Sequence, residues 1–255
     1  MSPFLLTCRS IHRRKSWVIC AFAVGVLPFL LPYVSAAAEN ASLYKPALAQ
    51  ATWALAWICA LGWGFFTAAH AGDKLAQSGT GEFFSAAGIR PWQQLLSVWL
   101  ANLCFVAPLG IIAALVAIAG ASPALADERA AWIATNFQYT VLFILAVGPL
   151  LALSIAIASR FGAIAGFFLS GSLAIYGLYG VGYLKLLTSL EDHPVLTWLA
   201  RISPHYHLAD PTERLRYKMG EIDWSGFPLL LAYFFGIALF LLALSRAVFR
   251  TRATA

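Results

Sequence analysis

Charged residues are scarce in this sequence. Only 11% of the 255 residues are Asp, Glu, Lys or Arg, whereas 61% are hydrophobic. With a mean hydropathy of +0.77, the chain has too few polar groups to cover the surface of a water-soluble globular protein. The sequence therefore predicts a membrane protein.

Several catalytic signatures are also missing. A nucleotide-binding phosphate loop ends in Gly-Lys followed by Ser or Thr, and the sequence contains no Gly-Lys pair. The chain is therefore not an ATPase by that route. It also lacks His-Glu-x-x-His, Gly-x-Ser-x-Gly and Cys-x-x-Cys, which mark zinc enzymes, hydrolases and thiol sites. The four cysteines are scattered and indicate small buried side chains rather than a disulfide framework.

Six runs of 22 to 36 residues contain no Asp, Glu, Lys or Arg. About 20 apolar residues cross a bilayer as a helix, so the sequence predicts an all-α membrane protein with a single transmembrane domain over residues 1–255. The six expected spans cover about 17–38, 47–69, 92–119, 134–158, 161–184 and 226–245. Pro28 should kink the first span. Basic residues followed by an apolar stretch also resemble a cleavable signal peptide, and cleavage would leave five spans. Spans without ionisable residues argue against a proton- or sodium-coupled carrier.

Basic residues orient the expected bundle, because short cytoplasmic loops retain Lys and Arg. Ten of the 17 basic residues fall on the side of the N-terminus: Arg9, Arg13, Arg14, Lys15, Lys74, Arg90, Arg160, Arg246, Arg250 and Arg252. This pattern predicts a multi-pass membrane protein with both termini in the cytoplasm. The net charge of +6 then reflects topology and anionic lipid headgroups, not nucleic-acid binding.

The loop after the second span predicts a short inner helix at about residues 80–88. Thr80 is expected to cap it, Glu82 lies near the positive end of its dipole, and Gly88 ends it in a left-handed conformation. Phe83 and Phe84 are expected to project apolar surface. The simplest interpretation is an interfacial helix whose phenylalanines dip into lipid.

The outer segment at about residues 190–224 predicts two short interfacial or re-entrant helices. One should run from Pro211 to Met219, capped by Asp210 and ended by Gly220. His205, His207 and Asp210 are weak candidates for a metal site, since the two histidines would point to opposite sides if the backbone were extended.

The fifth span carries small residues at four-residue spacing: Gly162, Gly166, Ser170 and Ala174. Such a stripe allows close helix approach. It serves either packing within the chain or a dimer face.

This layout resembles the membrane subunits of ABC-2 type transporters, and within them the NosY and gliding-motility GldF-like permeases. The resemblance covers nearly the whole chain. The inner loop carries it through Asp73-Lys74, Gly79-Thr80, Glu82-Phe83-Phe84 and Arg90, and the outer segment through Ile202-Ser-Pro-His-Tyr-His207, Arg216 and Gly220-Glu-Ile-Asp-Trp224.

The resemblance implies a type V exporter fold and a permease subunit of the bacterial inner membrane. Such a subunit is not itself an enzyme and needs no cofactor of its own. It would form a homodimer or heterodimer on a cytoplasmic ABC ATPase that binds the ATP. Thr80, Glu82, Phe83 and Phe84 would form the coupling helix for that ATPase. The outer helices would cap the translocation path, and the fifth span would lie near the dimer interface. Two other functions stay open: a membrane-embedded enzyme or metal-handling protein using the outer histidines, and a non-transporting membrane scaffold.

Overall fold

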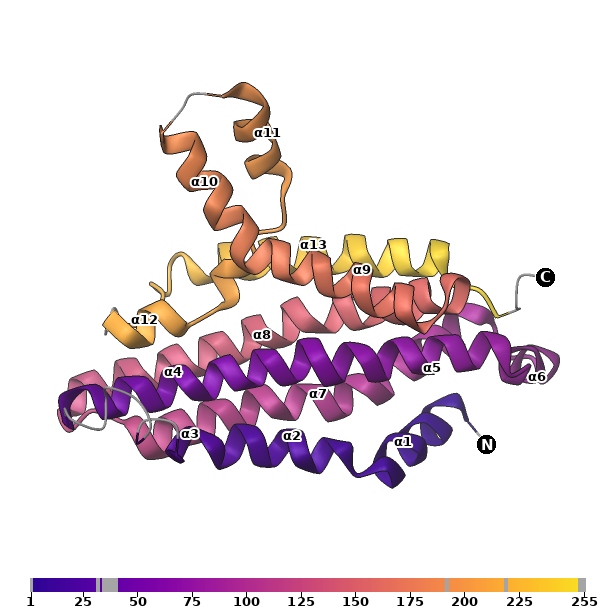
Figure 1. Cartoon of the computed structure of the whole chain (residues 1–255), viewed down its shortest axis with the longest axis horizontal. Coiled ribbons are helices and arrows are strands. Elements are labelled where there is room, and N and C mark those ends of the chain that lie inside the picture. The colour runs from indigo at the N-terminus through magenta and orange to yellow at the C-terminus, as the bar shows by residue number, and fades with distance from the viewer. Residues whose placement is uncertain (1, 31–32, 34–40, 191–192, 218–219, 252–255) are drawn as a thin grey trace.

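The computed structural model describes residues 2–30, 33, 41–190, 193–217 and 220–251. Every regular element in this part of the chain is a helix. Five helical stretches are long and apolar enough to cross a membrane: Leu43–Gln77, Pro91–Ala121, Ala126–Phe161, Ala163–Leu190 and Phe227–Val248. They indicate a multi-pass membrane protein, and most of their length runs along the long axis of the bundle (Figure 1).

The first apolar segment is shorter than predicted over its described residues. Helix α2 (Ser16–Gly25) and the short α3 (Leu27–Leu30) follow each other with a break at Val26. Pro28 has no N–H to donate to the carbonyl four residues back, which explains an interruption close to the predicted kink. Residues 31–32 and 34–38 of the predicted span lie outside the described residues. Five of the six predicted spans therefore have a matching helix.

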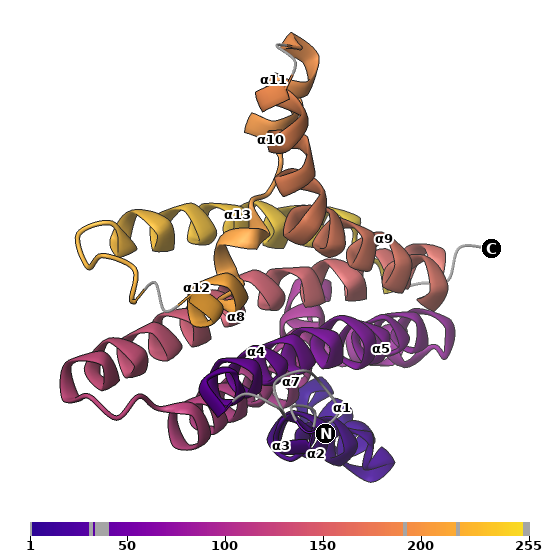
Figure 2. The same cartoon turned by 60° about the vertical axis from the view of Figure 1, so that its left-hand side comes forward.

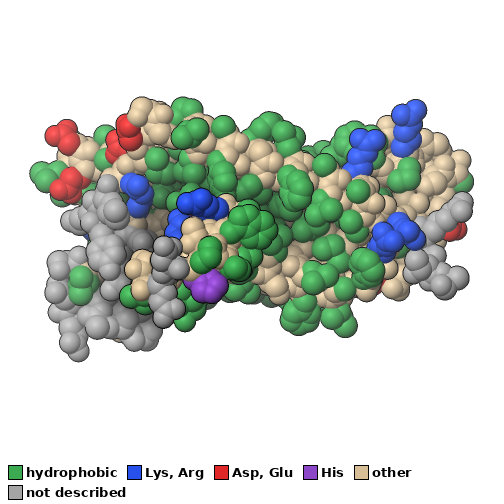
Figure 3. Space-filling view, turned by 90° about the horizontal axis from the view of Figure 1, so that it is seen from above, with side chains coloured by type: hydrophobic (Ala, Val, Ile, Leu, Met, Phe, Trp, Pro, Cys, Tyr) green, Lys and Arg blue, Asp and Glu red, His purple; other side chains and the backbone are tan. Residues whose placement is uncertain are grey.

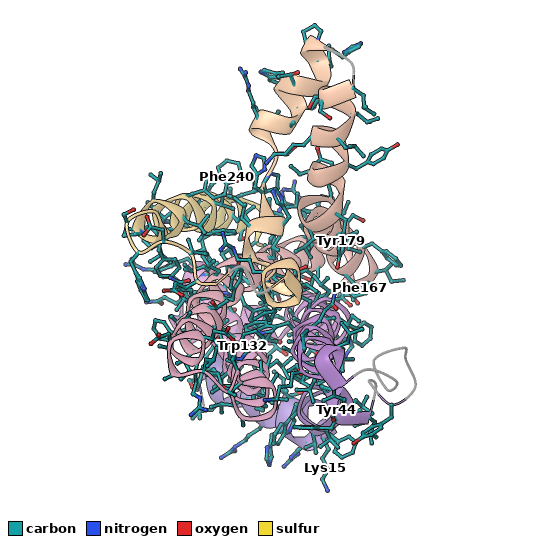
Figure 4. All side chains as sticks on the ribbon, turned by 90° about the vertical axis from the view of Figure 1, so that its left-hand side faces the viewer. Lys15, Tyr44, Trp132, Phe167, Tyr179 and Phe240 are labelled. Carbon is teal, nitrogen blue, oxygen red and sulfur yellow. The ribbon has the colours of Figure 1, made fainter. Side chains whose placement is uncertain are left out.

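An amphipathic helix that the sequence analysis missed precedes this segment. Helix α1 (Pro3–Arg14) starts with the side chain of Ser2 accepting a hydrogen bond from the N–H of Leu5 at 3.3 Å. It packs against α7 (Pro91–Ala121) and buries Ile11. Lys15 then adopts a left-handed conformation (φ 55°), which turns the chain into α2. Figure 4 shows Lys15 pointing outward at this elbow.

The second stretch consists of α4 (Ala41–Cys59), a π-helical turn η3 (Ala60–Gly64) and α5 (Phe65–Gln77). Toward its C-terminal end, α5 crosses α8 (Ala126–Phe161) at the level of Gly72. A Cβ at this position would lie 2.2 Å from the carbonyl oxygen of Ile155. The two backbones are therefore in direct contact here, and only glycine fits.

Helix α8 is the central element of the bundle. In its most apolar 18-residue window 83% of the residues are buried, against at most 44% in the other four long stretches. Its polar side chains bond to neighbouring elements: Asn136 accepts from the indole N–H of Trp53 at 2.9 Å, and the Ser154 hydroxyl donates to the carbonyl oxygen of Phe65 at 3.2 Å. Because each buried polar group is costly unless bonded, these contacts hold the stretch of α4 and α5 against α8. Figure 4 shows Trp132 of α8 inside the bundle and Phe240 of α13 (Phe227–Val248) on its outside.

The fifth span is continuous but bent. It consists of α9 (Ala163–Ile175), a π-helical turn η4 (Tyr176–Gly180) and α10 (Val181–Leu190). π-Helical turns often bend a helix, and beyond this turn α10 leaves the bundle. With α11 (Pro194–Ile202) it forms a hairpin that projects sideways in both ribbon views (Figures 1 and 2). We call α10 and α11 the outer arm.

The rest of the outer segment returns to the bundle. A 3-10 turn η5 (Tyr206–Ala209) buries Tyr206, and the short helix α12 (Thr212–Tyr217) follows. The predicted helix from Pro211 thus starts one residue later, and its predicted end at Met219 lies outside the described residues. Gly220 is left-handed as expected (φ 74°). The side-chain amide of Gln138 in α8 holds this segment by donating to the carbonyl oxygen of Ile222 and accepting from its N–H, both at 2.8 Å.

Charge is distributed unevenly along the bundle. In Figure 3 hydrophobic side chains cover the middle of the face, and charged side chains gather toward its two ends. Lys and Arg prevail at the end where α13 finishes. Helix α1 and the helix after α5 lie toward the same end (Figure 1). An apolar band between charged ends is the arrangement expected of a bundle that crosses a membrane.

Candidate functional site

The predicted inner helix is present as α6 (Thr80–Ala86), at the basic end of the bundle. The prediction that Thr80 caps it is wrong. Gly79 is the N-cap, in a left-handed conformation (φ 69°), and Thr80 is the first helical residue. The Thr80 hydroxyl instead pairs with the Ser78 hydroxyl at 2.5 Å, because the tight turn at Gly79 brings these two side chains together. Glu82 lies in the first turn, as predicted, and its side chain is exposed.

The end of α6 follows the prediction. Gly88 is left-handed (φ 84°), and the N–H of Ile89 donates to the carbonyl oxygen of Phe84 at 2.9 Å. The chain then enters α7 through Arg90, whose N–H donates to the side chain of Gln93 at 3.0 Å. These bonds satisfy backbone groups that a helix end leaves free, so α6 has a defined direction relative to α7.

Gln94 is the residue that fixes α6 most directly, and the sequence analysis missed it. The two N–H groups of its buried side-chain amide are shared among three acceptors: the carbonyl oxygen of Gly81 at 3.2 Å, the Ser85 hydroxyl at 3.1 Å and the carbonyl oxygen of Ile89 at 3.0 Å from the nitrogen. One amide therefore ties the start, middle and end of the inner helix to the first turn of α7. The available signal was a glutamine in the first turn of an apolar span.

The two phenylalanines of α6 have opposite surroundings. Phe83 is 69% exposed, whereas Phe84 is only 4% exposed and belongs to the main core. The expectation that both project apolar surface is therefore wrong for Phe84. Successive residues of a helix lie on different faces, and the face of Phe84 is the one that packs against the bundle.

The segment that follows α13 covers the other side of α6. A Cβ at Gly81 would lie 2.8 Å from the carbonyl oxygen of Thr251 and 2.9 Å from that of Leu75. The same segment is held on α8, where the N–H of Arg250 donates to the Ser159 hydroxyl at 3.1 Å. Gly81 is thus the residue that lets the inner helix pack closely between α5 and the C-terminal segment.

The outer histidines lie close together, contrary to the expectation for an extended loop. The ring centroids of His205 and His207 are 5.3 Å apart, because a helical turn begins between them. The carboxylate of Asp210 accepts hydrogen bonds from the N–H and hydroxyl of Thr212, the first residue of α12. Among the described residues no group of three or more His, Cys, Asp or Glu side chains is placed to hold a metal ion.

Burial lowers the pKa of His205 below its ordinary value, and the charge of Lys185 and the neighbouring His207 lower it further. The backbone N–H of His205 donates to the Tyr233 hydroxyl of α13 at 2.9 Å. His205 therefore connects the outer segment to α13, and its surroundings favour the neutral imidazole.

The small residues of the fifth span pack within the chain. Gly162 is the left-handed junction between α8 and α9 (φ 89°). Gly166, Ser170 and Ala174 are buried, and the Ser154 hydroxyl of α8 contacts the carbonyl oxygen of Gly166 at 3.2 Å. Of the two alternatives for this stripe, the structure favours packing within the chain, because α8 already occupies its face. Large side chains cover the other faces of α9, including Ile164 at 77% and Phe168 at 62% exposed.

Comparisons of the chain with known protein families, with curated proteins and with solved structures found no match. Two features of the described chain bear on function: the firmly held helix α6 with one exposed aromatic ring, and the outer arm, which projects from the side of the bundle.

Proposed function

We propose that this protein is the membrane-spanning permease subunit of an ATP-driven export system of the ABC-2 type, which couples to a separate cytoplasmic ATPase. In this proposal the segment from Ser16 onward forms a sixth span, both termini are cytoplasmic, and the membrane is the bacterial inner membrane. The excess of Lys and Arg at the end that carries α6 supports this orientation.

The observation that carries the proposal is the exposed ring of Phe83 on an immobilised helix. Helix α6 is fixed by the Gln94 amide, by burial of Phe84 and by the C-terminal segment over Gly81. A short helix need not be held this firmly if the Phe83 ring only inserts into lipid. It is required if the helix transmits force, because binding energy from an aromatic anchor is greatest when the anchor is pre-organised.

The outer arm supports assembly with a second permease subunit. Its exposed apolar side chains include Leu186, Leu190, Val195, Trp198 and Ile202, and it projects beyond the surface of its own bundle. An apolar hairpin of this kind needs either lipid or another protein against it. A second permease subunit on this side would leave the arms over a path between the two bundles, where an amphiphilic or lipid-linked cargo has access from the membrane.

Co-purification tests the ATPase contact. The tagged chain is extracted from its native membranes in mild detergent, and bound proteins are identified by mass spectrometry. We expect an ATPase with a phosphate loop to co-purify with the wild type and to be lost with Phe83→Asp. Loss of a central aromatic anchor costs about 2 kcal/mol or more, roughly a thirtyfold loss of affinity.

Phe161→Asp is the matched control, because Phe161 is 63% exposed at the same end of the bundle but lies on α8. This variant should retain the ATPase. Equal retention by the Phe83 variant, with both proteins monodisperse, would refute the coupling role. Loss of the ATPase without any change in flux would instead indicate a scaffold.

A further inference from the structure

A pocket at the basic end of the bundle is not used by the proposed coupling contact. It has a volume of about 70 Å³ and lies between α1, α5 and α7. Side chains of α1 form one wall, side chains of α5 the opposite wall, and Thr80 at the start of α6 contributes to the edge. The pocket therefore exists only because the missed helix α1 packs beside the bundle.

The polar groups that line the pocket are those that an anion requires. Arg14 comes from α1 and Lys74 from α5, with His70 one turn earlier on the same helix. Ser10 and Thr67 add hydroxyl groups, whereas the Thr7 hydroxyl donates to the carbonyl oxygen of Pro3 at 2.9 Å and the Thr80 hydroxyl pairs with that of Ser78. Among the described residues that line the pocket there is no Asp or Glu. The nearby Asp73 accepts a hydrogen bond from the Gln77 side chain at 2.6 Å and is not among the lining residues.

The remaining lining is apolar and continues to the outside. Leu6, Ile11, Ala71, Leu75 and Val98 complete the pocket. Leu6 is 40% exposed, so the apolar wall reaches the surface of α1. A water molecule needs roughly 10–15 Å³ of such volume, so the pocket takes one phosphate or carboxylate group but not a large polar cargo.

We infer that this pocket binds an anionic phospholipid of the inner leaflet, with the headgroup phosphate between Arg14 and Lys74 and the acyl chains along the apolar surface of α1. Two cations without a carboxylate supply charge complementarity. An apolar wall leading outward fits a ligand that is charged at one end only. The choice of leaflet rests on the orientation proposed above, whereas lipid binding itself needs no ATPase partner.

Native mass spectrometry of the purified full chain tests this inference, with phosphatidylglycerol as the anionic probe and phosphatidylcholine as the zwitterionic one. We expect the wild type to retain phosphatidylglycerol. The double variant Arg14→Gln, Lys74→Gln should bind it about thirtyfold more weakly, since each basic residue contributes about a factor of five near anionic lipid.

The matched control is Arg13→Gln, Arg160→Gln, which removes two charges at the same end without touching the pocket. An equal loss in this control would overturn the inference, because binding would then follow net charge. A second variant, Ala71→Leu, fills the pocket without changing charge and should also lose the lipid while the chain stays monodisperse. If millimolar inorganic phosphate displaces the lipid fully, or if phosphatidylcholine binds equally well, the site is not one for an anionic phospholipid.

Discussion

Replacing Gly72 by alanine would test whether α5 and α8 touch backbone to backbone. On helix propensity alone, alanine should stabilise α5 by about 1 kcal/mol. In the structure, however, the new methyl group would lie 2.2 Å from the carbonyl oxygen of Ile155 and 2.9 Å from its carbonyl carbon. Neither atom can rotate away, so the crossing itself must open.

The size of the effect follows from these distances. Ordinary contact begins at 3.4 Å, so the two helices must separate locally by about 1 Å. Overpacking of this kind costs about 1–3 kcal/mol, and backbone contact at the most buried helix places Gly72 at the upper end. Because the gain in helix propensity offsets about 1 kcal/mol of this cost, we expect the free energy of unfolding to fall by about 2 kcal/mol. For a chain of this length that lowers the Tm by about 4–8 °C.

Thermal unfolding in mild detergent, followed by size-exclusion chromatography of heated samples, measures this loss. Gly171→Ala in α9 and Gly236→Ala in α13 are the controls, because a Cβ at either position meets nothing within 4 Å. They should match the wild type or exceed it slightly. If Gly72→Ala melts with these controls, α5 and α8 are not in backbone contact, and the position derived for α6 at the end of α5 is wrong.

Two further predictions concern the outer segment. Gln138→Leu removes both hydrogen bonds to the backbone of Ile222, and the unpaired backbone groups should weaken the attachment of the outer segment to α8 by about 1–3 kcal/mol. Amide hydrogen exchange should therefore rise in residues 220–226. Thr140→Val is the control, because it loses a bond only within α8 and should leave these amides protected. Acidification should also loosen this segment. Because burial lowers the pKa of His205 in the folded state, the detached segment binds a proton more readily, so attachment is strongest above the ordinary histidine pKa of about 6.5 and weakens as the pH falls through it. Amide exchange of residues 203–209, corrected for intrinsic rates, should show this loss, and His205→Gln should abolish its pH dependence; protection that grows on acidification would contradict the reasoning.

The long helices could be predicted because composition and local backbone chemistry agree on them. Charge-free runs located five of them. Gly88 and Pro91 predicted the end of the inner helix and the start of α7, and the structure has both. Helix α8 nevertheless starts at Ala126, eight residues before the predicted span. Asp127 and Glu128 interrupt a charge-free run but stabilise the first turn of a helix through its dipole. Counting charges therefore finds the membrane-crossing part and underestimates the helix.

The amphipathic helix α1 could have been found by a different criterion. Ser2 followed by Pro3 is a helix-start signal, and His12, Arg13 and Arg14 fall in the last turn, where basic side chains are favourable. Arginines interrupt its sequence at Arg9, Arg13 and Arg14, so α1 contains no long charge-free run and a search for such runs misses it. The pocket beside α1 could not be predicted at all, because Arg14 and Lys74 are 60 residues apart in sequence and line the same pocket only because α1 packs against α7.

The inner helix shows why adjacent, chemically identical residues cannot be assigned from sequence. Phe83 and Phe84 both suit a partner contact, and helical geometry requires only that they face different directions. Which one points outward depends on the Gln94 amide and on the C-terminal segment over Gly81, and both come from other parts of the chain. The consequence is functional. A defect after substitution of the buried Phe84 reports the folding of α6, so only the exposed Phe83 can separate partner binding from stability.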